Sequence, residues 1–88
     1  MTSLEVIVSG RVQGVWYRGW TVDQAHRLGV NGSVRNLPDG TVQVIVCGPS
    51  DKVDALLDLL WQGPPLAQVS DVRSIPTEAP TAPGFHQV

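Results

Sequence analysis

The sequence predicts an α+β fold in which an antiparallel β-sheet carries two helices on one face. Three observations lead to this class. Strand-like and helix-like segments follow one another in the order βαββαβ, a proline–aspartate–glycine turn joins two strand segments, and one segment has apolar residues at helical spacing. The split βαβ, or ferredoxin-like, sandwich satisfies this order best.

The first half of the pattern is a strand followed by a helix. Residues alternate in character along Leu4–Ser9, with the period of two that is typical of a strand. Arg18–Leu28 can then form a helix that has Val22, Ala25 and its last leucine on one side, and Gly29 suits the left-handed residue after a helix end.

The middle of the chain predicts a β-hairpin. Two β-rich runs, Val30–Leu37 and Thr41–Cys47, are separated by Pro38-Asp39-Gly40. The proline presets the turn, and the glycine suits a positive φ at its exit.

The second helix has the clearest pattern. Ser50 can cap it, and Gly63-Pro64-Pro65 ends it. Its apolar residues lie at i, i+3, i+4 and i+7, which places them on one face: Val53, Leu56, Leu57 and Leu60.

The last part of the chain predicts an irregular strand and a short terminal one. Ala67–Ile75 reads as a strand, but Val69 and Val72 are out of phase, which indicates a bulge. A proline-punctuated connection over Pro76–Pro83 follows. Gly84–Val88 then allows a short fifth strand.

Length and composition restrict the class of protein. With 88 residues, 42% of them hydrophobic and 16% charged, we expect a single globular domain over residues 1–88, and a monomer. No apolar run reaches the length of a membrane span, and the N-terminus lacks the features of a signal peptide. Cys47 is the sole cysteine, so no internal disulfide can form, and we expect a cytoplasmic location without membrane association.

The net charge of −2 disfavours a protein that coats nucleic acid or anionic lipid, because both partners require a basic surface. Any anion site must therefore be local. The stretch Gly10–Arg18 offers one, because Gly10 and Gly14 allow backbone N–H groups to converge on phosphate oxygens. Arg18 adds charge at a helix start, where unpaired N–H groups already favour an anion.

The predicted topology brings a second polar residue to this loop. In a split βαβ unit the first two strands are parallel, with the third between them, so their carboxyl ends lie at the same edge. Those ends are about 10 Å apart, twice the interstrand spacing. Arg18 and Asn36 can therefore both reach one small ligand.

The residues in this pattern resemble the acylphosphatase family. The matching positions are Gly10–Val15, Tyr17, Arg18, Ala25, Leu28–Gly29, Gly32, Val34–Asn36, Asp39–Gly40, Gly63–Pro64 and Ala67–Val69. The resemblance implies an enzyme without metal or cofactor that splits a small acyl phosphate into a carboxylate and inorganic phosphate. It implies that Arg18 binds the phosphate and that Asn36 positions the water.

By the same resemblance, the backbone of Gly14, Val15, Trp16, Tyr17 and Arg18 forms the oxyanion cradle. The chain departs from the family at Trp16, where a smaller residue is usual, and at Ser33, where an aromatic residue is frequent.

The chemistry of an acyl phosphate suits these residues. A carboxylate leaving group, whose conjugate acid has a pKa near ~4, departs without a protein acid. Phosphoryl transfer then depends on positioning and on electrostatic stabilisation, which the arginine fork and the loop N–H groups can supply. Because asparagine is a poor base, we expect the proton of the water to pass to a phosphate oxygen of the substrate.

Two other functions fit parts of the pattern. A module that binds phosphate or carbamoyl phosphate without hydrolysis would share the cradle. An RNA-binding domain would share the βαββαβ order, but the predicted central strands lack the aromatic residues that stack on bases.

Several conspicuous residues are assigned no chemistry. We expect Trp16, Tyr17 and Trp20 to support the core. His26 and His86 have no metal-ligand spacing. The terminal segment Phe85–Val88 is expected to lie away from the reaction.

Overall fold

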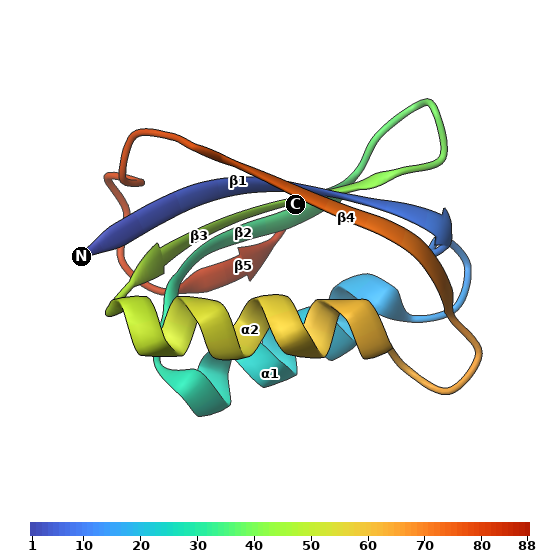
Figure 1. The fold of residues 1–88 in the computed structure, drawn as a ribbon, viewed down its shortest axis with the longest axis horizontal. Helices are drawn as coiled ribbons and strands as arrows, with labels where there is room; N and C mark the ends of the chain where they lie inside the picture. The colour runs from blue at the N-terminus through green and yellow to red at the C-terminus, as the bar shows by residue number, and fades with distance from the viewer.

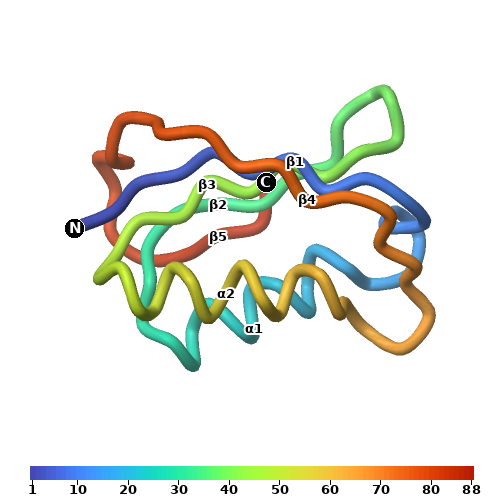
Figure 2. Tube along the Cα trace, in the orientation of Figure 1, coloured from blue at the N-terminus to red at the C-terminus, as the bar shows by residue number.

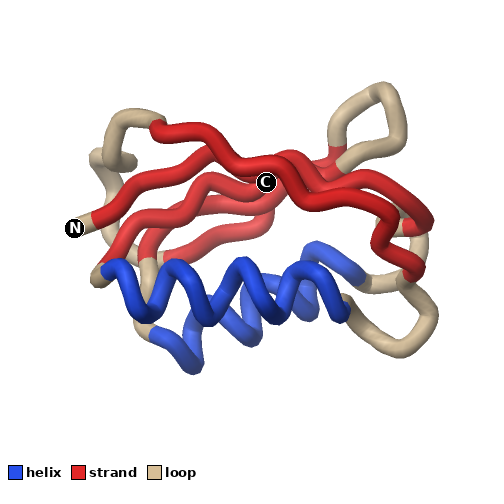
Figure 3. The backbone as a smooth tube through the Cα atoms, in the orientation of Figure 1, coloured by secondary structure: helices blue, strands red, loops and turns tan.

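A computed structural model describes residues 1–88 of the chain and contains five strands and two helices (Figure 1). In chain order these are β1 (Thr2–Arg11), α1 (Tyr17–Leu28), β2 (Asn31–Asn36), β3 (Val42–Gly48), α2 (Ser50–Gln62), β4 (Gln68–Pro76) and β5 (Phe85–Gln87). The strands form one sheet in the order β4-β1-β3-β2-β5, and both helices cover the same face of it (Figures 1 and 3). The ferredoxin-like α+β fold is confirmed.

The position of β3 sets the geometry of the site. It pairs antiparallel with β1 on one side and with β2 on the other. Strands β1 and β2 are therefore parallel to each other, and their carboxyl ends lie at the same edge of the sheet. The loop after β1 and the last residue of β2, Asn36, meet at that edge.

The sheet is mixed rather than wholly antiparallel, which corrects the sequence prediction. Strand β5 pairs parallel with β2, with Gly32 opposite Phe85 and Val34 opposite Gln87. The reason is the path of the preceding connection. Strand β4 ends at Pro76 beside Leu4, at the end of the sheet where β1 and β2 both begin. The chain crosses that end (Figure 2), so β5 starts level with β2 and runs in the same direction.

The core lies between the sheet and the helices and is rich in valine. One face of β1, β3 and β2 contributes alternate buried residues, as a half-buried strand should. Helix α2 buries Val53, Leu56 and Leu60, as its spacing predicts. Helix α1 buries Tyr17, Thr21 and Ala25, at i, i+4 and i+8.

The predicted apolar side of α1 is therefore only partly correct. Val22 and Leu28 pack against the core but stay partly exposed, whereas the buried row includes a tyrosine and a threonine. The burial of Thr21 could not be predicted, because threonine is polar. Its hydroxyl donates to the Tyr17 carbonyl at 2.8 Å within the helix, and this bond satisfies the hydroxyl in the core.

The hairpin turn forms as predicted. The Asp39 carboxylate accepts hydrogen bonds from the Thr41 hydroxyl at 2.6 Å and from the Thr41 N–H at 3.0 Å. These bonds hold the pKa of Asp39 below its usual value. The turn thus stabilises itself beside the end of β2.

Two predicted details of the second half had different outcomes. The bulge is confirmed: β4 pairs Asp71 with Ser9 but Val69 with Gly10, so Ser70 is the extra residue. The prediction that Ser50 caps α2 is wrong. Ser50 is the first helical residue after Pro49, and its hydroxyl hydrogen-bonds to the Thr2 hydroxyl at 2.7 Å.

The bulge also explains Gly10. This glycine has φ 120°, and a Cβ there would lie 2.1 Å from the Gln68 carbonyl oxygen. Gly10 is required by the close approach of β4 and not by the anion cradle, of which it was expected to form part.

Neither helix is long and apolar enough to cross a membrane; the longer one, α2, has 13 residues.

Candidate active site

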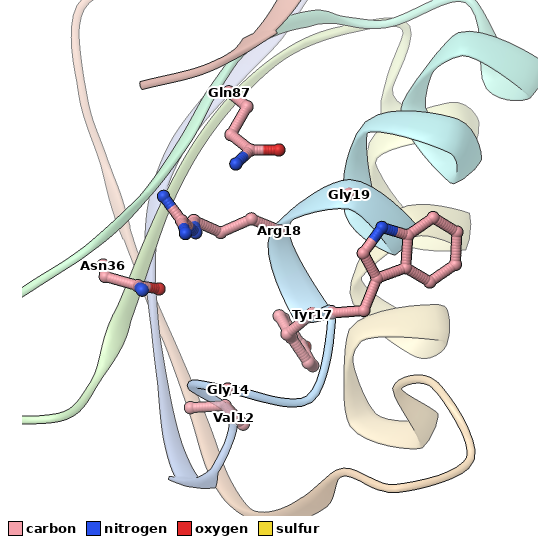
Figure 4. Close-up of a pocket in the computed structure, with 8 residues that line it drawn as sticks. Val12, Gly14, Tyr17, Arg18, Gly19, Asn36 and Gln87 are labelled. Carbon is pink, nitrogen blue, oxygen red and sulfur yellow. The ribbon is translucent and has the colours of Figure 1, made fainter.

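A pocket of about 120 Å³ lies at the edge where β1, β2 and β5 end (Figure 4). It is lined by Val12, Gly14, Trp16, Tyr17, Arg18, Gly19, Asn36 and Gln87. One water molecule needs only about 10–15 Å³ of such space, so the pocket has room for a larger group such as a phosphoryl group. The pocket brings together Arg18 and Asn36, which are far apart in the sequence.

The loop between β1 and α1 supplies the backbone of the pocket. Gly14 and Trp16 have left-handed φ values of 74° and 65°, and Trp16 is the residue before the helix. The first N–H in this region to donate to a carbonyl is that of Trp20, which bonds to the Trp16 oxygen at 3.0 Å. The N–H groups from Gly14 to Gly19 thus have no partner within the protein. Such a run of free N–H groups at a helix start is a site for an anion.

Trp16 is the sole non-glycine residue with a positive φ. That conformation is strained for a bulky side chain, and strain of this kind is frequent at functional sites. The indole lies against Gly19, where a Cβ would be 2.2 Å from the indole nitrogen. Gly19 therefore leaves room for the ring at the rim of the pocket.

Arg18 is the only charged residue in the pocket lining. Its guanidinium makes no hydrogen bond or ion pair with the protein, whose single ion pair joins Arg73 and Asp71 on the surface. The positive charge is uncompensated and adds to the positive end of the helix dipole. The pocket is therefore electrostatically suited to a small anion.

Asn36 forms the opposite wall of the pocket. Its side-chain oxygen, Oδ1, is buried and has no hydrogen-bond partner. Such an unsatisfied acceptor costs about 1–3 kcal/mol of stability, which a protein tolerates most readily where function requires it. No donor of the protein therefore competes with a ligand for this oxygen.

Gln13, for which no role was expected, joins the two halves of the site. Its side-chain Nε2 donates to the Leu37 and Thr41 carbonyls, at 2.9 Å each. These carbonyls flank the hairpin turn directly after Asn36. The loop that carries the N–H groups is therefore fastened to the strand end that carries the amide. A glutamine next to a glycine gives no such signal in the sequence, because its acceptors lie more than 20 residues away.

We expect Gln13→Glu to weaken both the fold and the site. The carboxylate cannot donate and would face two carbonyl oxygens, so urea denaturation should show a loss of about 2 kcal/mol at neutral pH. The affinity for inorganic phosphate should fall about tenfold as the loop shifts, which calorimetry measures. Retention of full stability and of phosphate affinity would show that the two bonds do not hold the loop.

Tyr17 anchors the start of α1. Its side chain is buried, and its hydroxyl donates to the Leu60 carbonyl at 2.6 Å. Leu60 lies in the last turn of α2, where carbonyls have no partner within the helix. The bond therefore ties the pocket side of α1 to the end of α2. Burial raises the pKa of the Tyr17 phenol above its ordinary value.

The raised pKa of Tyr17 predicts that the folded protein loses stability as the pH rises into the alkaline range. The unfolded phenol releases its proton near pH ~10 and the folded one at higher pH, so the unfolded state binds fewer protons above that point. The stabilising contribution is present below pH ~10 and is lost as the pH rises further. Tyr17→Phe should cost about 1–2 kcal/mol at pH 7 and should remove this alkaline decline, because Tyr17 is the sole tyrosine. Urea titrations of both proteins from pH 7 to 11 measure it.

The side chain of Val15 is in the core, at 7% exposure, which leaves its backbone for the expected cradle. Two sequence-based expectations for this region change in the structure. Trp16 is 64% exposed, so it does not support the core, whereas Tyr17 is buried and Trp20 packs beside it. Gln87, in the terminal segment expected to lie away from the reaction, lines the pocket.

Comparisons with known proteins identify the family of this chain. The model of the family described as "Acylphosphatase" matches residues 4–87. An acylphosphatase of Rhodospirillum rubrum is 53% identical over 87 residues, which cover 99% of this chain and 96% of that protein.

Solved structures have the same fold. An acylphosphatase from Coxiella burnetii has a TM-score of 0.94 at 37% identity, covering 99% of this chain and 92% of that one. The crystal structure of acylphosphatase from Bacillus subtilis also has a TM-score of 0.94, at 28% identity, covering 100% of this chain and 99% of that one. On its sequence and on its fold, the chain belongs to the acylphosphatase family.

Proposed function

We propose that the protein hydrolyses acyl phosphates by direct attack of water on a phosphoryl group held by Arg18 and the loop N–H groups. Membership of the acylphosphatase family makes the chain an acylphosphatase. The observation that carries the assignment of roles is the convergence on one pocket of a free guanidinium, a run of unpaired N–H groups and an unpartnered amide oxygen.

The phosphoryl group binds between Arg18 and the loop. The planar guanidinium donates to two of its oxygens, and the N–H groups from Gly14 to Arg18 donate to the others. Charge on these oxygens is redistributed in the loose transition state, where fixed donors stabilise it without reorganisation.

The attacking water binds to Asn36. The Oδ1 atom accepts one of its hydrogen bonds and aims the water oxygen at phosphorus. No donor of the protein competes for this atom. The lining contains no carboxylate or histidine that could act as a base, so the proton of the water passes to a phosphoryl oxygen. The P–O bond to the acyl group breaks, and its electron pair leaves with the carboxylate.

A direct assay tests this function. Purified protein in the presence of EDTA should release equal amounts of benzoate and inorganic phosphate from benzoyl phosphate, and inorganic phosphate should inhibit competitively. Comparison of acetyl, carbamoyl and benzoyl phosphates then defines the acyl preference. Phosphate binding without turnover of any of the three would instead identify a non-hydrolytic binding module.

We further propose that residues 1–88 act as a single monomeric domain on a small molecule in the cytoplasm. All pocket residues come from one chain, so no second copy is needed to complete the site. The sole cysteine, Cys47, is buried and unpaired, which suits a reducing compartment. Light scattering coupled to gel filtration should give the monomer mass of 9.5 kDa. A dimer mass would contradict the proposal.

A further inference from the structure

Gln87 faces the pocket because of the register of the last strand. Residues opposite each other on parallel neighbours project to the same face of a sheet, and residues two apart on one strand share that face. Gln87 lies opposite Val34, which is fully buried toward the helices. Asn36 follows Val34 by two residues. The Gln87 and Asn36 side chains therefore leave the same face of adjacent strands, beside the start of α1.

Strand β5 is short but firmly held. Phe85 is 2% exposed, and a ring N–H of His26 on α1 donates to its carbonyl at 3.0 Å. After Gln87, the Val88 N–H donates to the Val34 carbonyl at 2.9 Å. The backbone of Gln87 is thus fixed from both sides, whereas its side-chain amide has no hydrogen-bond partner in the protein. The Gln87 amide is therefore held at the pocket and is free to form a hydrogen bond with a ligand.

The roles of the other polar groups define which part of the ligand Gln87 meets. Gln87 lines the same pocket as Arg18 and Asn36, and Figure 4 shows its amide on the far side of the Arg18 guanidinium from the Asn36 amide. Attack on phosphorus is in line, so the leaving group departs on the side opposite the water. With the water on Asn36 and the phosphoryl group between Arg18 and the loop, the Gln87 amide is left for the acyl group.

We propose that the Gln87 side-chain N–H donates a hydrogen bond to the acyl carbonyl oxygen of the bound substrate. This inference rests on the proposed function and assigns Gln87 to the acyl half of the same site. The bond strengthens as negative charge develops on the departing carboxylate, so it contributes to the transition state as well as to binding. It also favours acyl phosphates over phosphate esters that have no carbonyl at that position.

Two phosphonates isolate this contact without turnover. In 2-oxo-2-phenylethylphosphonate a methylene replaces the bridging oxygen of benzoyl phosphate and the carbonyl remains, whereas 2-phenylethylphosphonate lacks the carbonyl. Calorimetry measures the Kd of both, and of inorganic phosphate, for the wild type, Gln87→Met and the control Gln62→Met. Methionine keeps the length of glutamine but cannot donate, and Gln62 is exposed at the end of α2, outside the pocket.

The expected result is selective. Gln87→Met should bind the carbonyl phosphonate about tenfold more weakly, with less than a twofold change for the other phosphonate and for phosphate, while Gln62→Met matches the wild type. The kcat/KM for benzoyl phosphate should fall about tenfold in Gln87→Met alone.

Three results would overturn the inference. These are an equal loss for both phosphonates, no loss for either, or a wild type that does not prefer the carbonyl compound. The failure of the proposed function would look different. A wild type that binds the carbonyl phosphonate selectively but does not hydrolyse benzoyl phosphate would refute hydrolysis and leave the Gln87 contact standing.

Discussion

Arg18→Lys is expected to lower kcat/KM for benzoyl phosphate by about 10²- to 10³-fold, corresponding to about 3–4 kcal/mol of transition-state stabilisation. Lysine keeps the charge but replaces a planar fork by a point charge, so it cannot hold two phosphoryl oxygens at once. The inhibition constant of inorganic phosphate should rise as well, because the same fork binds the product. Steady-state kinetics with phosphate as competitor measures both.

The matched control is Arg27→Lys. Arg27 lies on the same helix as Arg18, but it is exposed in the last turn and far from the pocket lining. This variant should behave like the wild type in turnover, phosphate inhibition and stability. If Arg18→Lys also retained its turnover and its phosphate affinity, the phosphoryl group would not bind where we place it.

Asn36→Leu is expected to lower kcat by about 100-fold or more while leaving phosphate inhibition within about twofold of the wild type. Leucine has a similar size but cannot accept a hydrogen bond, so the attacking water loses its alignment. The phosphate cradle of Arg18 and the loop is not altered. A lowered kcat with an unchanged phosphate affinity therefore shows that Asn36 positions the water, whereas Arg18 binds the phosphoryl group.

The same substitution should not destabilise the protein. The buried Asn36 Oδ1 has no partner, and removal of an unsatisfied buried acceptor recovers its desolvation cost of about 1–3 kcal/mol. The thermal midpoint of Asn36→Leu should therefore equal or exceed that of the wild type, as is common for residues kept for activity. A large drop in the midpoint would mean that Asn36 supports the fold, and a lowered kcat would then say little about the water.

Local patterns account for much of the fold. The stripe of α2, the alternation of β1 and the Pro38-Asp39-Gly40 turn depend on neighbours within a few residues, and these predictions are confirmed. Even the meeting of Arg18 and Asn36 could be anticipated, because the order of elements restricts the topology to a split βαβ unit. This topology brings together two residues that are too far apart in the sequence for a helical or strand period to place them side by side.

Two of the predictions that failed concern contacts made at a distance. The Ser50 hydroxyl bonds to Thr2 rather than to its own helix, and Gly10 is required by the approach of Gln68. In both cases a partner remote in sequence overrides the local preference. The third failure has a local cause: the aromatic character of Trp16 suggests burial, yet its left-handed backbone turns the side chain out to the rim.

The sequence by itself therefore determined the succession of elements and the two polar side chains that the topology must bring to one edge. Only the tertiary structure decided which other groups join them. Gln13 reaches its carbonyl acceptors across the hairpin, and Gln87 enters the pocket through a parallel pairing with β2. The physical reason is register: a shift of one residue in β5 would turn Gln87 to the opposite face of the sheet, and nothing local in the chain specifies that alignment.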